Sequence, residues 1–308
     1  MKKSDTLFLV NDKEAYFYPY EDRCIKPIKD GVIWLLLSRV FIKLNLKLPV
    51  FLLNTSLKRK NGKVVITDSA YSKSLLMTLK NEGYNCKLYY MNHVDSFNKK
   101  YMENFNRDDV VTYSNYDAKK YGIKFASTPY SSKIKEVLKL NQNTKMYDVI
   151  FLGREKGRRK KIDDLYIFLT KLGLRCKFMV FGSTSDIKDI RQEDYVKYID
   201  YISDVVKTNC IIELLPIDDY SQVPEGKPDK TLRSLEALFL NKKLITDNQE
   251  FVNSDVYDSN NTFILGKDDK NRLYDFIKKP YVLGSQNQII CPKYDFSNWI
   301  ELFFEKEN

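Results

Sequence analysis

Short apolar runs alternate with amphipathic segments along most of the chain. Helices are predicted at 72–79 and 117–121, where apolar residues recur at helical spacing. Strands are predicted at 63–67, 86–91, 110–114, 147–152, 176–181, 210–215, 243–246 and 262–265. Alternation of strands and helices is typical of parallel, doubly wound sheets with helices on both faces. The pattern therefore predicts an α/β fold.

The segment 227–247 predicts a helix that leads into a buried strand. Its leucines recur at helical spacing and form one apolar face. Asp229 is the predicted N-cap, because its short side chain can accept from free amides of the first turn. Asn241 is the predicted C-cap, and Lys242 and Lys243 follow where the helix dipole favours cations.

The polar residues of this helix suit a phosphate ligand. Lys227, Thr231 and Arg233 lie near the helix start, where unpaired amides and a partial positive charge favour anions. Glu236 lies one turn further along, where a carboxylate can accept from ribose hydroxyls. The alternative is a solvated glutamate on an amphipathic surface helix.

A second candidate anion site follows the predicted strand 147–152. The strand ends at Gly153, and six lysines and arginines, including Arg154 and Lys156, lie between 154 and 161. A strand, a glycine and cations ahead of a helix can hold an anion at the carboxyl edge of a parallel sheet. The alternative is a solvated basic face.

The two stretches together resemble a known family. FLGREKG, followed about eighty residues later by TLRSLEALFLNKKLITDN, is similar to the donor-binding half of GT-B glycosyltransferases, above all those of bacterial capsule and lipopolysaccharide synthesis. The resemblance implies that Arg154 and Lys156 hold the diphosphate of a nucleotide sugar and that Glu236 holds the ribose. Pro228 stands where many retaining members carry a second glutamate, so a retaining mechanism is not carried over.

The resemblance also implies the domain organisation. A GT-B fold has two Rossmann-like doubly wound domains with a cleft between them. We expect an acceptor-side domain at 1–135, a nucleotide-sugar domain at 146–290 and a last helix at 291–308 that crosses back to the first domain.

Three polar residues of the N-terminal half directly follow predicted strands. Asp68, His93 and Asp117 should therefore lie near one carboxyl edge of the first sheet. If the reaction inverts the anomeric centre, a base must take the acceptor proton. Asp68 is the first candidate and His93 the second; the alternative for Asp68 is a structural cap after a strand. No Asp-x-Asp motif occurs, and neither a metal nor another cofactor is expected.

The most apolar stretch is 31–53. Arg39, Lys43 and Lys47 interrupt it, so it lacks the uncharged length of a membrane span. The pattern predicts a helix over 31–45. We favour a core helix of the N-terminal domain, with a helix on a membrane surface as the alternative.

The formal charge of +10 indicates an anionic partner: a nucleotide, a nucleic acid or a membrane surface. The five cysteines form no CxxC pair, and the start of the chain is unlike a signal peptide, so we expect the protein in a reducing cytoplasm. The expectation includes peripheral contact with the inner face of the cell membrane.

The function predicted is transfer of a sugar from a nucleotide-diphosphate sugar, with UDP as one option, to a hydroxyl of a bacterial surface glycan or lipid-linked glycan. A nucleic-acid-binding protein and a non-catalytic partner subunit are the alternatives. Nucleic acid is not the expected partner, because the cations cluster after a strand without interleaved aromatics.

Overall fold

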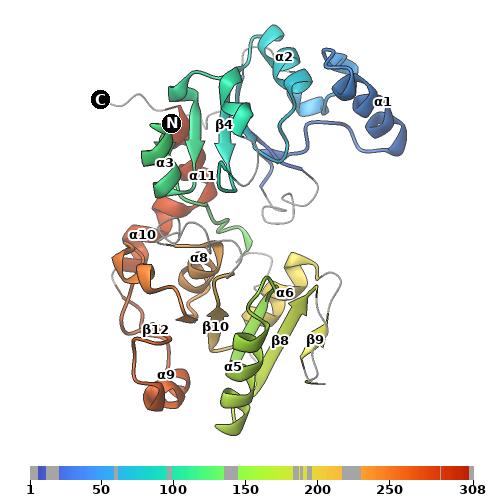
Figure 1. Cartoon of the computed structure of the whole chain (residues 1–308). Helices are drawn as coiled ribbons and strands as arrows, with labels where there is room; N and C mark the ends of the chain where they lie inside the picture. The colour runs from blue at the N-terminus through green and yellow to red at the C-terminus, as the bar shows by residue number, and fades with distance from the viewer. Residues whose placement is uncertain are drawn as a thin grey trace. The chain divides into compact units, whose positions relative to one another are not determined.

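The computed structural model describes residues 6–11, 21–58, 62–95, 99–134, 145–182, 187, 190–192, 196–216, 230–284 and 286–304. The chain forms two compact units. The first unit comprises Met1–Ser131 with Phe296–Asn308, and the second comprises Ser132–Asp295. Each unit contains one parallel sheet with helices packed against it (Figure 1).

The sheet of the first unit has the order β2-β1-β3-β4-β5-β6, and every neighbouring pair is parallel. Its strands are β1 (Leu7–Leu9), β2 (Cys24–Ile25), β3 (Lys63–Thr67), β4 (Asn85–Tyr90), β5 (Val110–Thr112) and β6 (Lys124–Phe125). The strand order reverses between β1 and β3. Such a switch point is where ligands bind in open α/β sheets, beyond the carboxyl ends of the strands.

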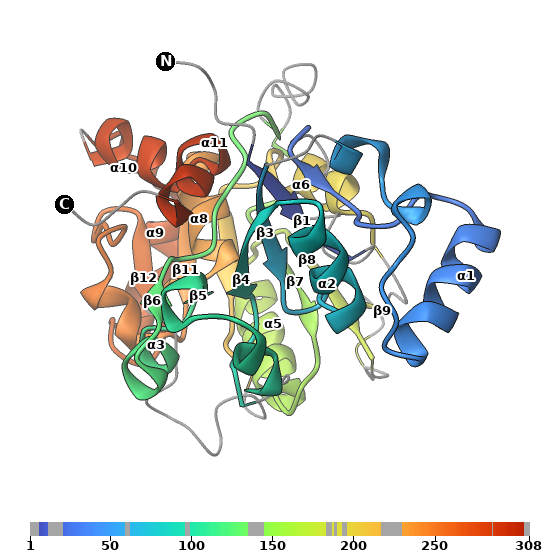
Figure 2. The same ribbon diagram turned by 90° about the horizontal axis from the view of Figure 1, so that it is seen from above.

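The helices of the first unit cover this sheet and its edges. They are α1 (Val32–Lys43), α2 (Lys73–Asn81), α3 (Asn115–Tyr121) and α11 (Phe296–Trp299), with 3-10 turns η1 (Val50–Leu52), η2 (Thr55–Lys58), η3 (Lys99–Asn104), η4 (Arg107–Asp109) and η8 (Ile300–Phe303). Helix α2 begins after Ser72, whose hydroxyl accepts from the Leu75 amide. Helix α1 lies outermost, beyond α2 (Figures 1 and 2).

The end of the chain completes the core of the first unit. Trp299 is 1% exposed and packs edge-on against Phe8, Tyr89 and Phe303. Its indole nitrogen donates to the Ser127 carbonyl at 2.6 Å. Strands β1 and β4 therefore bury one of their faces against residues that lie more than two hundred positions away in the sequence.

The sheet of the second unit has the order β12-β11-β10-β7-β8-β9, again entirely parallel. Its strands are β7 (Val149–Arg154), β8 (Cys176–Phe181), β9 (Arg191–Gln192), β10 (Cys210–Glu213), β11 (Lys243–Thr246) and β12 (Thr262–Ile264). Counted within this unit, the order is that of the dinucleotide-binding Rossmann fold, with its switch point between β7 and β10.

The helices of the second unit connect these strands. They are α5 (Arg159–Lys171), α6 (Tyr198–Val205), α8 (Leu232–Phe239), α9 (Leu273–Lys278) and α10 (Gln286–Tyr294), with turns η6 (Gln249–Asn253) and η7 (Lys270–Arg272). The main core forms where α5 packs against β7, β8 and β10, through residues such as Ile162, Phe151 and Phe178.

These sheets confirm the predicted fold class of two Rossmann-like, doubly wound parts. The bounds of β3, β8 and β11 agree with the predicted strands. Strand β7 runs two residues further than expected, so Gly153 and Arg154 belong to the strand and not to the turn after it. Strands β1, β2, β6 and β9, of two or three residues each, were not predicted.

The prediction of Asp229 as N-cap was wrong. Helix α8 is capped by Thr231, whose hydroxyl accepts from the amides of Arg233 and Ser234. The Ser234 hydroxyl in turn accepts from the Thr231 amide at 2.9 Å, which closes a reciprocal capping box. Asp229 lies outside the described residues. At the other end Leu240 is the C-cap, and Asn241 follows it with φ of 52°.

The two lysines after α8 cap other helices. Lys242 donates to the carbonyls of Val206 and Thr208 at 2.7 and 2.8 Å, just beyond α6. Lys243 is buried in β11 and donates to carbonyls at the end of α9, among them Phe276. A cation near carbonyls at a helix end is the predicted chemistry, but the packing of the sheet decides which helix receives it.

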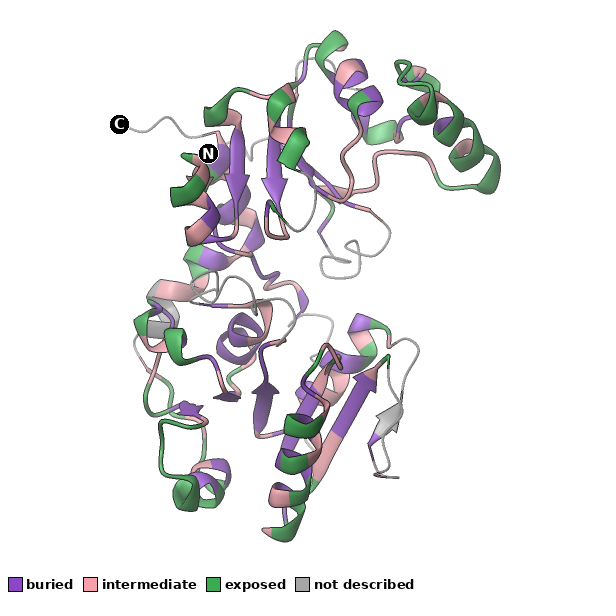
Figure 3. Cartoon of the chain, in the orientation of Figure 1, coloured by how far each residue is buried: buried purple, intermediate pink, exposed green. Residues whose placement is uncertain are grey.

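The helix predicted over 31–45 is present as α1, but the expectation that it is a core helix was wrong. Of the residues of α1, only Ser38 is buried, while Trp34 and Phe41 pack partly against the core. Figure 3 shows most of the helix as exposed. In the part of the chain that the structure describes, no helix is both long enough and apolar enough to cross a membrane.

Candidate functional site

The switch point of the second sheet brings the end of β7, which was predicted as part of a site, next to the end of β10. Strands β7 and β10 are hydrogen-bonded neighbours, with Phe151 paired to Ile212. Gly153 and Arg154 end β7, and Glu213 ends β10. Open α/β sheets bind ligands beyond the carboxyl ends of the strands at such a point. The topology therefore indicates a ligand site here without reference to any family.

The Arg158 side chain packs closely over Gly153. A Cβ at Gly153 would lie 2.5 Å from Nη2 of Arg158. The Arg158 side chain folds back over this position, donates from Nε to the Arg154 carbonyl at 2.9 Å and places its guanidinium 5.4 Å from the Phe151 ring centre. Arg158 is 7% exposed, so this cation is part of the structure of the turn.

The cations of α5 are engaged by carboxylates. Arg159 contacts Asp163 at 3.1 Å and Lys160 contacts Asp164 at 3.4 Å, both one helical turn away, while Lys161 pairs with Asp247. Three of the six cations of the basic stretch are therefore in ion pairs. The ion pairs also give the adjacent Asp163 and Asp164 a structural role.

Arg154 and Lys156 occupy different backbone environments at the start of the turn. Arg154 is exposed at the end of β7, and among the described residues no carboxylate forms an ion pair with it. Lys156 has φ of 40° and Gly157 has φ of 75°, a left-handed pair that reverses the chain between β7 and α5. The turn therefore presents Arg154 at the strand end and Lys156 at its apex.

The first turn of α8 adjoins the same edge. The Thr231 hydroxyl donates to the Glu213 carboxylate at the end of β10. Arg233 reaches β7, with Nη2 3.5 Å from the Leu152 carbonyl oxygen. The positive end of the α8 dipole is thereby held next to the ends of β7 and β10. Lys227, the other predicted residue of this helix start, lies outside the described residues.

Glu213 is a site residue that the sequence analysis missed. It is 4% exposed and accepts from Thr231 and, at 2.7 Å, from Thr246 at the end of β11. Burial raises the pKa of Glu213 above its usual value. The available signal was an acidic residue that ends a buried strand next to the predicted anion site.

Glu236 is neither solvated nor at the surface. It is 0% exposed, and its carboxylate accepts from Tyr198 at 2.8 Å, Tyr201 at 3.0 Å and Arg233 at 2.6 Å. The solvated alternative was therefore wrong. Burial of the Arg233 guanidinium opposes its positive charge, but the neighbouring Glu236 carboxylate outweighs this effect and raises the pKa of Arg233. The Arg233 guanidinium also lies 4.2 Å from the Tyr201 ring centre. Ribose binding by Glu236 stays a prediction.

Asp68 lies at the switch point of the first sheet, just after β3. It is 1% exposed. Oδ1 accepts from the Ser69 amide at 2.9 Å, and Oδ2 accepts from both the backbone and the side-chain nitrogen of Asn92 at 3.1 Å. The carboxylate thus ties the end of β3 to the end of β4. This arrangement matches the structural alternative for Asp68.

His93 follows β4 and is oriented by a buried carboxylate. Its Nδ1 lies 3.0 Å from Oδ2 of Asp117, which is 1% exposed and also accepts from the Val94 amide at 3.1 Å. The imidazole packs against Tyr113 with ring centres 5.4 Å apart. A histidine held by a carboxylate is the usual arrangement of a general base. The opposite ring nitrogen, Nε2, is buried. The roles of His93 and Asp68 as base stay predictions.

Asp117 owes its position to the start of α3. Ser114 caps this helix and accepts from the Asp117 amide at 3.2 Å. The side chain is thereby turned toward the end of β4. The structure brings His93 and Asp117 together, whereas Asp68 is engaged by Asn92.

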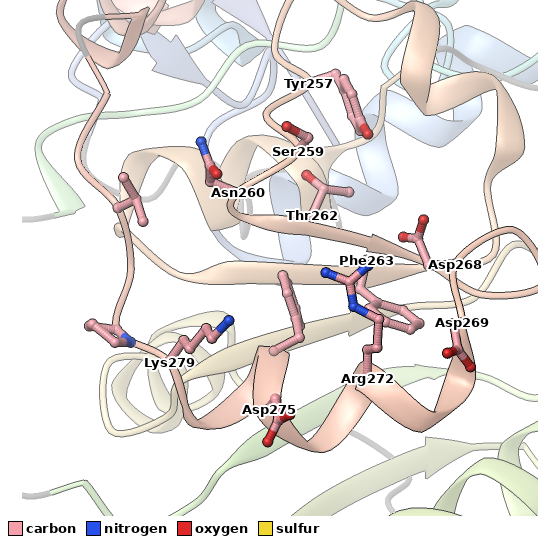
Figure 4. Close-up of a pocket in the computed structure, with 13 residues that line it drawn as sticks. Tyr257, Ser259, Asn260, Thr262, Phe263, Asp268, Asp269, Arg272, Asp275 and Lys279 are labelled. Atoms are coloured by element: carbon pink, nitrogen blue, oxygen red, sulfur yellow. The ribbon is translucent and has the colours of Figure 1, made fainter.

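Two hollows lie near the β12 side of the second unit. One, of about 340 Å³, lies between β12 and α9, with Tyr257 and Thr262 on one side and Asp268 and Arg272 on another (Figure 4). It contains none of the predicted site residues. The other, of about 650 Å³, is lined by Gly157, Lys160 and Lys161 from the basic turn and α5, together with residues after β12. Across the described ranges, no group of three or more His, Cys, Asp or Glu side chains is arranged to hold a metal ion.

Comparison with known proteins gives a result at the level of the fold. No protein-family model matches the sequence, and no curated protein matches it. Among solved structures, Anabaena Alr3699/HepE in complex with UDP and glucose matches with a TM-score of 0.51 and 12% identity over 97% of both chains. The fold is GT-B.

Two further solved structures are similar over most of their length. A glycosyltransferase from Rickettsia africae has 12% identity and a TM-score of 0.45 over 98% of both chains. Sucrose-phosphate synthase from Thermosynechococcus elongatus has 10% identity and a TM-score of 0.44, over 91% of this chain and 81% of that one. The GT-B assignment rests on the two sheet topologies and the HepE match.

Proposed function

We propose that this GT-B chain is a glycosyltransferase that uses a nucleotide-diphosphate sugar. The observation that carries the proposal is that Arg154, at the end of β7, and the start of α8 lie at the same edge of the second sheet, at its switch point. The Thr231–Glu213 and Arg233–Leu152 contacts hold this helix start against β10 and β7. Both features favour an anion, and a diphosphate is the anion common to nucleotide-sugar donors.

The donor-binding residues have separate roles in this proposal. Arg154, Lys156 and Lys227 contribute positive charge toward the diphosphate, and Gly153 keeps the end of β7 clear for the Arg158 packing that shapes the turn. Charge builds on the departing diphosphate in the transition state, so the cations and the α8 dipole stabilise it there. Arg233 acts as a positioning residue, because its guanidinium is held by Glu236 and Tyr201.

Proton removal is assigned to the first unit. His93 takes the proton of the acceptor hydroxyl on Nε2, the ring nitrogen opposite Asp117. Nε2 is buried in this structure, so the proposal requires that it become accessible to the acceptor. Asp117 holds the ring and stabilises the imidazolium that forms. Asp68 is the second candidate. A base of this kind serves an inverting displacement, in which the acceptor oxygen attacks as the diphosphate leaves.

The acceptor we propose is a hydroxyl of a bacterial surface glycan, including a lipid-linked one. We also propose that the transfer needs no metal ion. The similarity of the two sequence stretches to capsule and lipopolysaccharide enzymes supports the acceptor class. Arg154 and Lys156 support the metal-independent reaction, since their charges can do what a metal would do for the diphosphate.

A ligand screen followed by a transfer assay tests the proposal. Thermal shifts are measured with UDP, GDP, CDP, ADP and dTDP and with their sugars, starting from UDP-glucose. A ligand at a hundred times its Kd stabilises the native state by about 2.7 kcal/mol, which gives a clear rise in Tm. We expect one nucleotide to raise the Tm and its sugar to be transferred in excess EDTA. If no nucleotide diphosphate shifts the Tm, the donor site is wrong; if transfer stops with EDTA and returns with manganese, the cation mechanism is wrong.

A further inference from the structure

Helix α1 exposes a large apolar face. Nine of its twelve residues are exposed, and the only cations among them are Arg39 and Lys43. Its exposed apolar residues include Val32 at 73%, Ile33 at 69%, Leu36 at 54% and Val40 at 55%, and the face continues into Leu44, Leu46 and Phe51. We call these residues the α1 surface. Figure 3 shows it at the edge of the first unit.

The orientation of the helix follows from its inner face. Trp34, Ser38 and Phe41, spaced four and three residues apart, point toward the core. The Trp34 ring meets Phe51 at 6.2 Å, which joins η1 to the helix. An ordinary surface helix would be polar on the opposite side. Here that side carries Leu36 and Val32 beside Arg39 and Lys43, so the exposure is built into the sequence.

The charge around this surface has one sign. Residues 31–67 contain seven lysines and arginines and no aspartate or glutamate. The nearest preceding acid, Asp30, is paired with Lys26 at 2.8 Å. Arg39, Lys43 and Lys47 are all exposed within or next to the α1 surface. A partner for this face must therefore accept apolar side chains and supply negative charge.

We propose that the α1 surface lies on an anionic phospholipid bilayer. Leu36, Val32 and their apolar neighbours would enter the boundary between headgroups and acyl chains, and the cations would meet lipid phosphates. Lys and Arg can keep their charged ends in the headgroups while their stems lie along apolar surface. A helix of twelve residues spans about 18 Å against about 30 Å of hydrocarbon, so it rests on the bilayer and does not cross it.

A second copy of the chain fits this face less well. In a two-fold symmetric dimer the same patch meets itself. Arg39, Lys43 and Lys47 would then face like charges, and residues 31–67 offer no carboxylate to pair with them. An anionic bilayer satisfies both the apolar and the charged residues.

This inference does not depend on the proposed function. Binding to a bilayer can be measured with no donor, acceptor or turnover. If the chain is a glycosyltransferase for lipid-linked glycans, the same surface would bring its acceptor-side unit to the membrane that carries them.

Vesicle flotation tests the inference with the full chain. The probes are vesicles of phosphatidylcholine alone and of phosphatidylcholine with 30% phosphatidylglycerol. We expect the wild type to float with the anionic vesicles and much less with the neutral ones. The difference in binding between the two kinds of vesicle should increase at low salt. The double variant R39Q/K43Q should lower the partition coefficient about 30-fold, from about fivefold for each cation removed. Leu36→Asp should lower it about tenfold or more.

Matched controls separate this surface from general charge and general hydrophobicity. K73Q/K119Q removes two exposed cations of α2 and α3, and Ile167→Asp changes an apolar residue of α5 that is 41% exposed. Both should bind like the wild type. The proposal is overturned if the wild type stays unbound, if R39Q/K43Q and K73Q/K119Q lose equally, or if Leu36→Asp binds normally. Sedimentation in which Leu36→Asp converts a dimer to a monomer while vesicle binding persists would assign the face to a second copy.

Discussion

Nδ1 of His93 lies 3.0 Å from Oδ2 of Asp117, and this contact joins the end of β4 to the first turn of α3. The carboxylate also accepts from the Val94 amide, so its position is set by backbone on one side and by the Ser114 cap on the other. Two residues that are 24 positions apart thus form a pair that can orient a base.

Removing either member of this pair should damage proton transfer. We expect His93→Gln and Asp117→Asn each to lower kcat about 10²-fold or more, the scale of general-base loss, with donor Kd unchanged. The measurements are turnover with saturating acceptor and donor affinity by calorimetry. Asp68→Asn is the comparison, and its kcat should stay within a few-fold of wild type, because Asn92 and Ser69 engage its oxygens. A larger loss in Asp68→Asn than in His93→Gln would reverse the assignment.

Arg154 should contribute to donor binding, and Lys160 should not. Loss of a charge-assisted hydrogen bond costs about 1.5–3 kcal/mol, so Arg154→Ala should raise the Kd for the nucleotide diphosphate about 10- to 100-fold. It should lower kcat/KM as well, because the charge acts on the ground state and the transition state. Lys160→Ala is the matched control, since this side chain is 93% exposed and paired with Asp164. Equal weakening in both variants would indicate unspecific attraction to the basic turn.

We expect Glu236 to contribute to the stability of the fold, whether or not it also binds the ligand. Glu236→Gln keeps the volume but leaves the Arg233 guanidinium without its carboxylate, so we expect a loss of roughly 3 kcal/mol in the free energy of unfolding. Tyr198→Phe removes one hydrogen bond to the same carboxylate and should cost less. Urea unfolding measures both. If Glu236→Gln unfolds like the wild type while nucleotide affinity falls, Glu236 serves the ligand alone and the buried cluster is not structural.

Lys242 should make stability rise with pH. Burial, with a further contribution from the nearby Lys145 charge, lowers the pKa of Lys242 to about 8. Between this value and the usual pKa near 10.5, the unfolded chain binds more protons than the folded one, so the unfolding free energy increases with pH. Unfolding by urea from pH 7.5 to 9.5 should show a steeper rise in the wild type than in Lys242→Met. Parallel curves for the two proteins would contradict the lowered pKa.

Local sequence patterns were sufficient for strands whose central residues are buried. Strands β3, β8 and β11 were predicted with the bounds that the structure shows, because a buried parallel strand is a continuous apolar run between polar turns. The same alternation predicted the doubly wound class. It also placed Gly153 and Arg154 close to a carboxyl edge.

Cap choice and burial were decided by tertiary contacts. Thr231 caps α8, and its hydroxyl donates a hydrogen bond to Glu213, eighteen residues earlier. Nothing in the segment around Asp229 reveals that partner. Glu236 is buried because Tyr198 and Tyr201 from α6 close over it. The sequence pattern around a glutamate in a helix is the same whether its carboxylate accepts hydrogen bonds from water or from a tyrosine hydroxyl.

By itself, the sequence determined the fold class, most strands and helices, the basic turn and the absence of acid between 31 and 67. Only the tertiary structure decided that α1 turns its apolar residues outward and that His93 meets Asp117. The physical reason is that periodicity reports which residues share a face of an element. It does not report which neighbour covers that face, because the neighbour comes from a distant part of the chain.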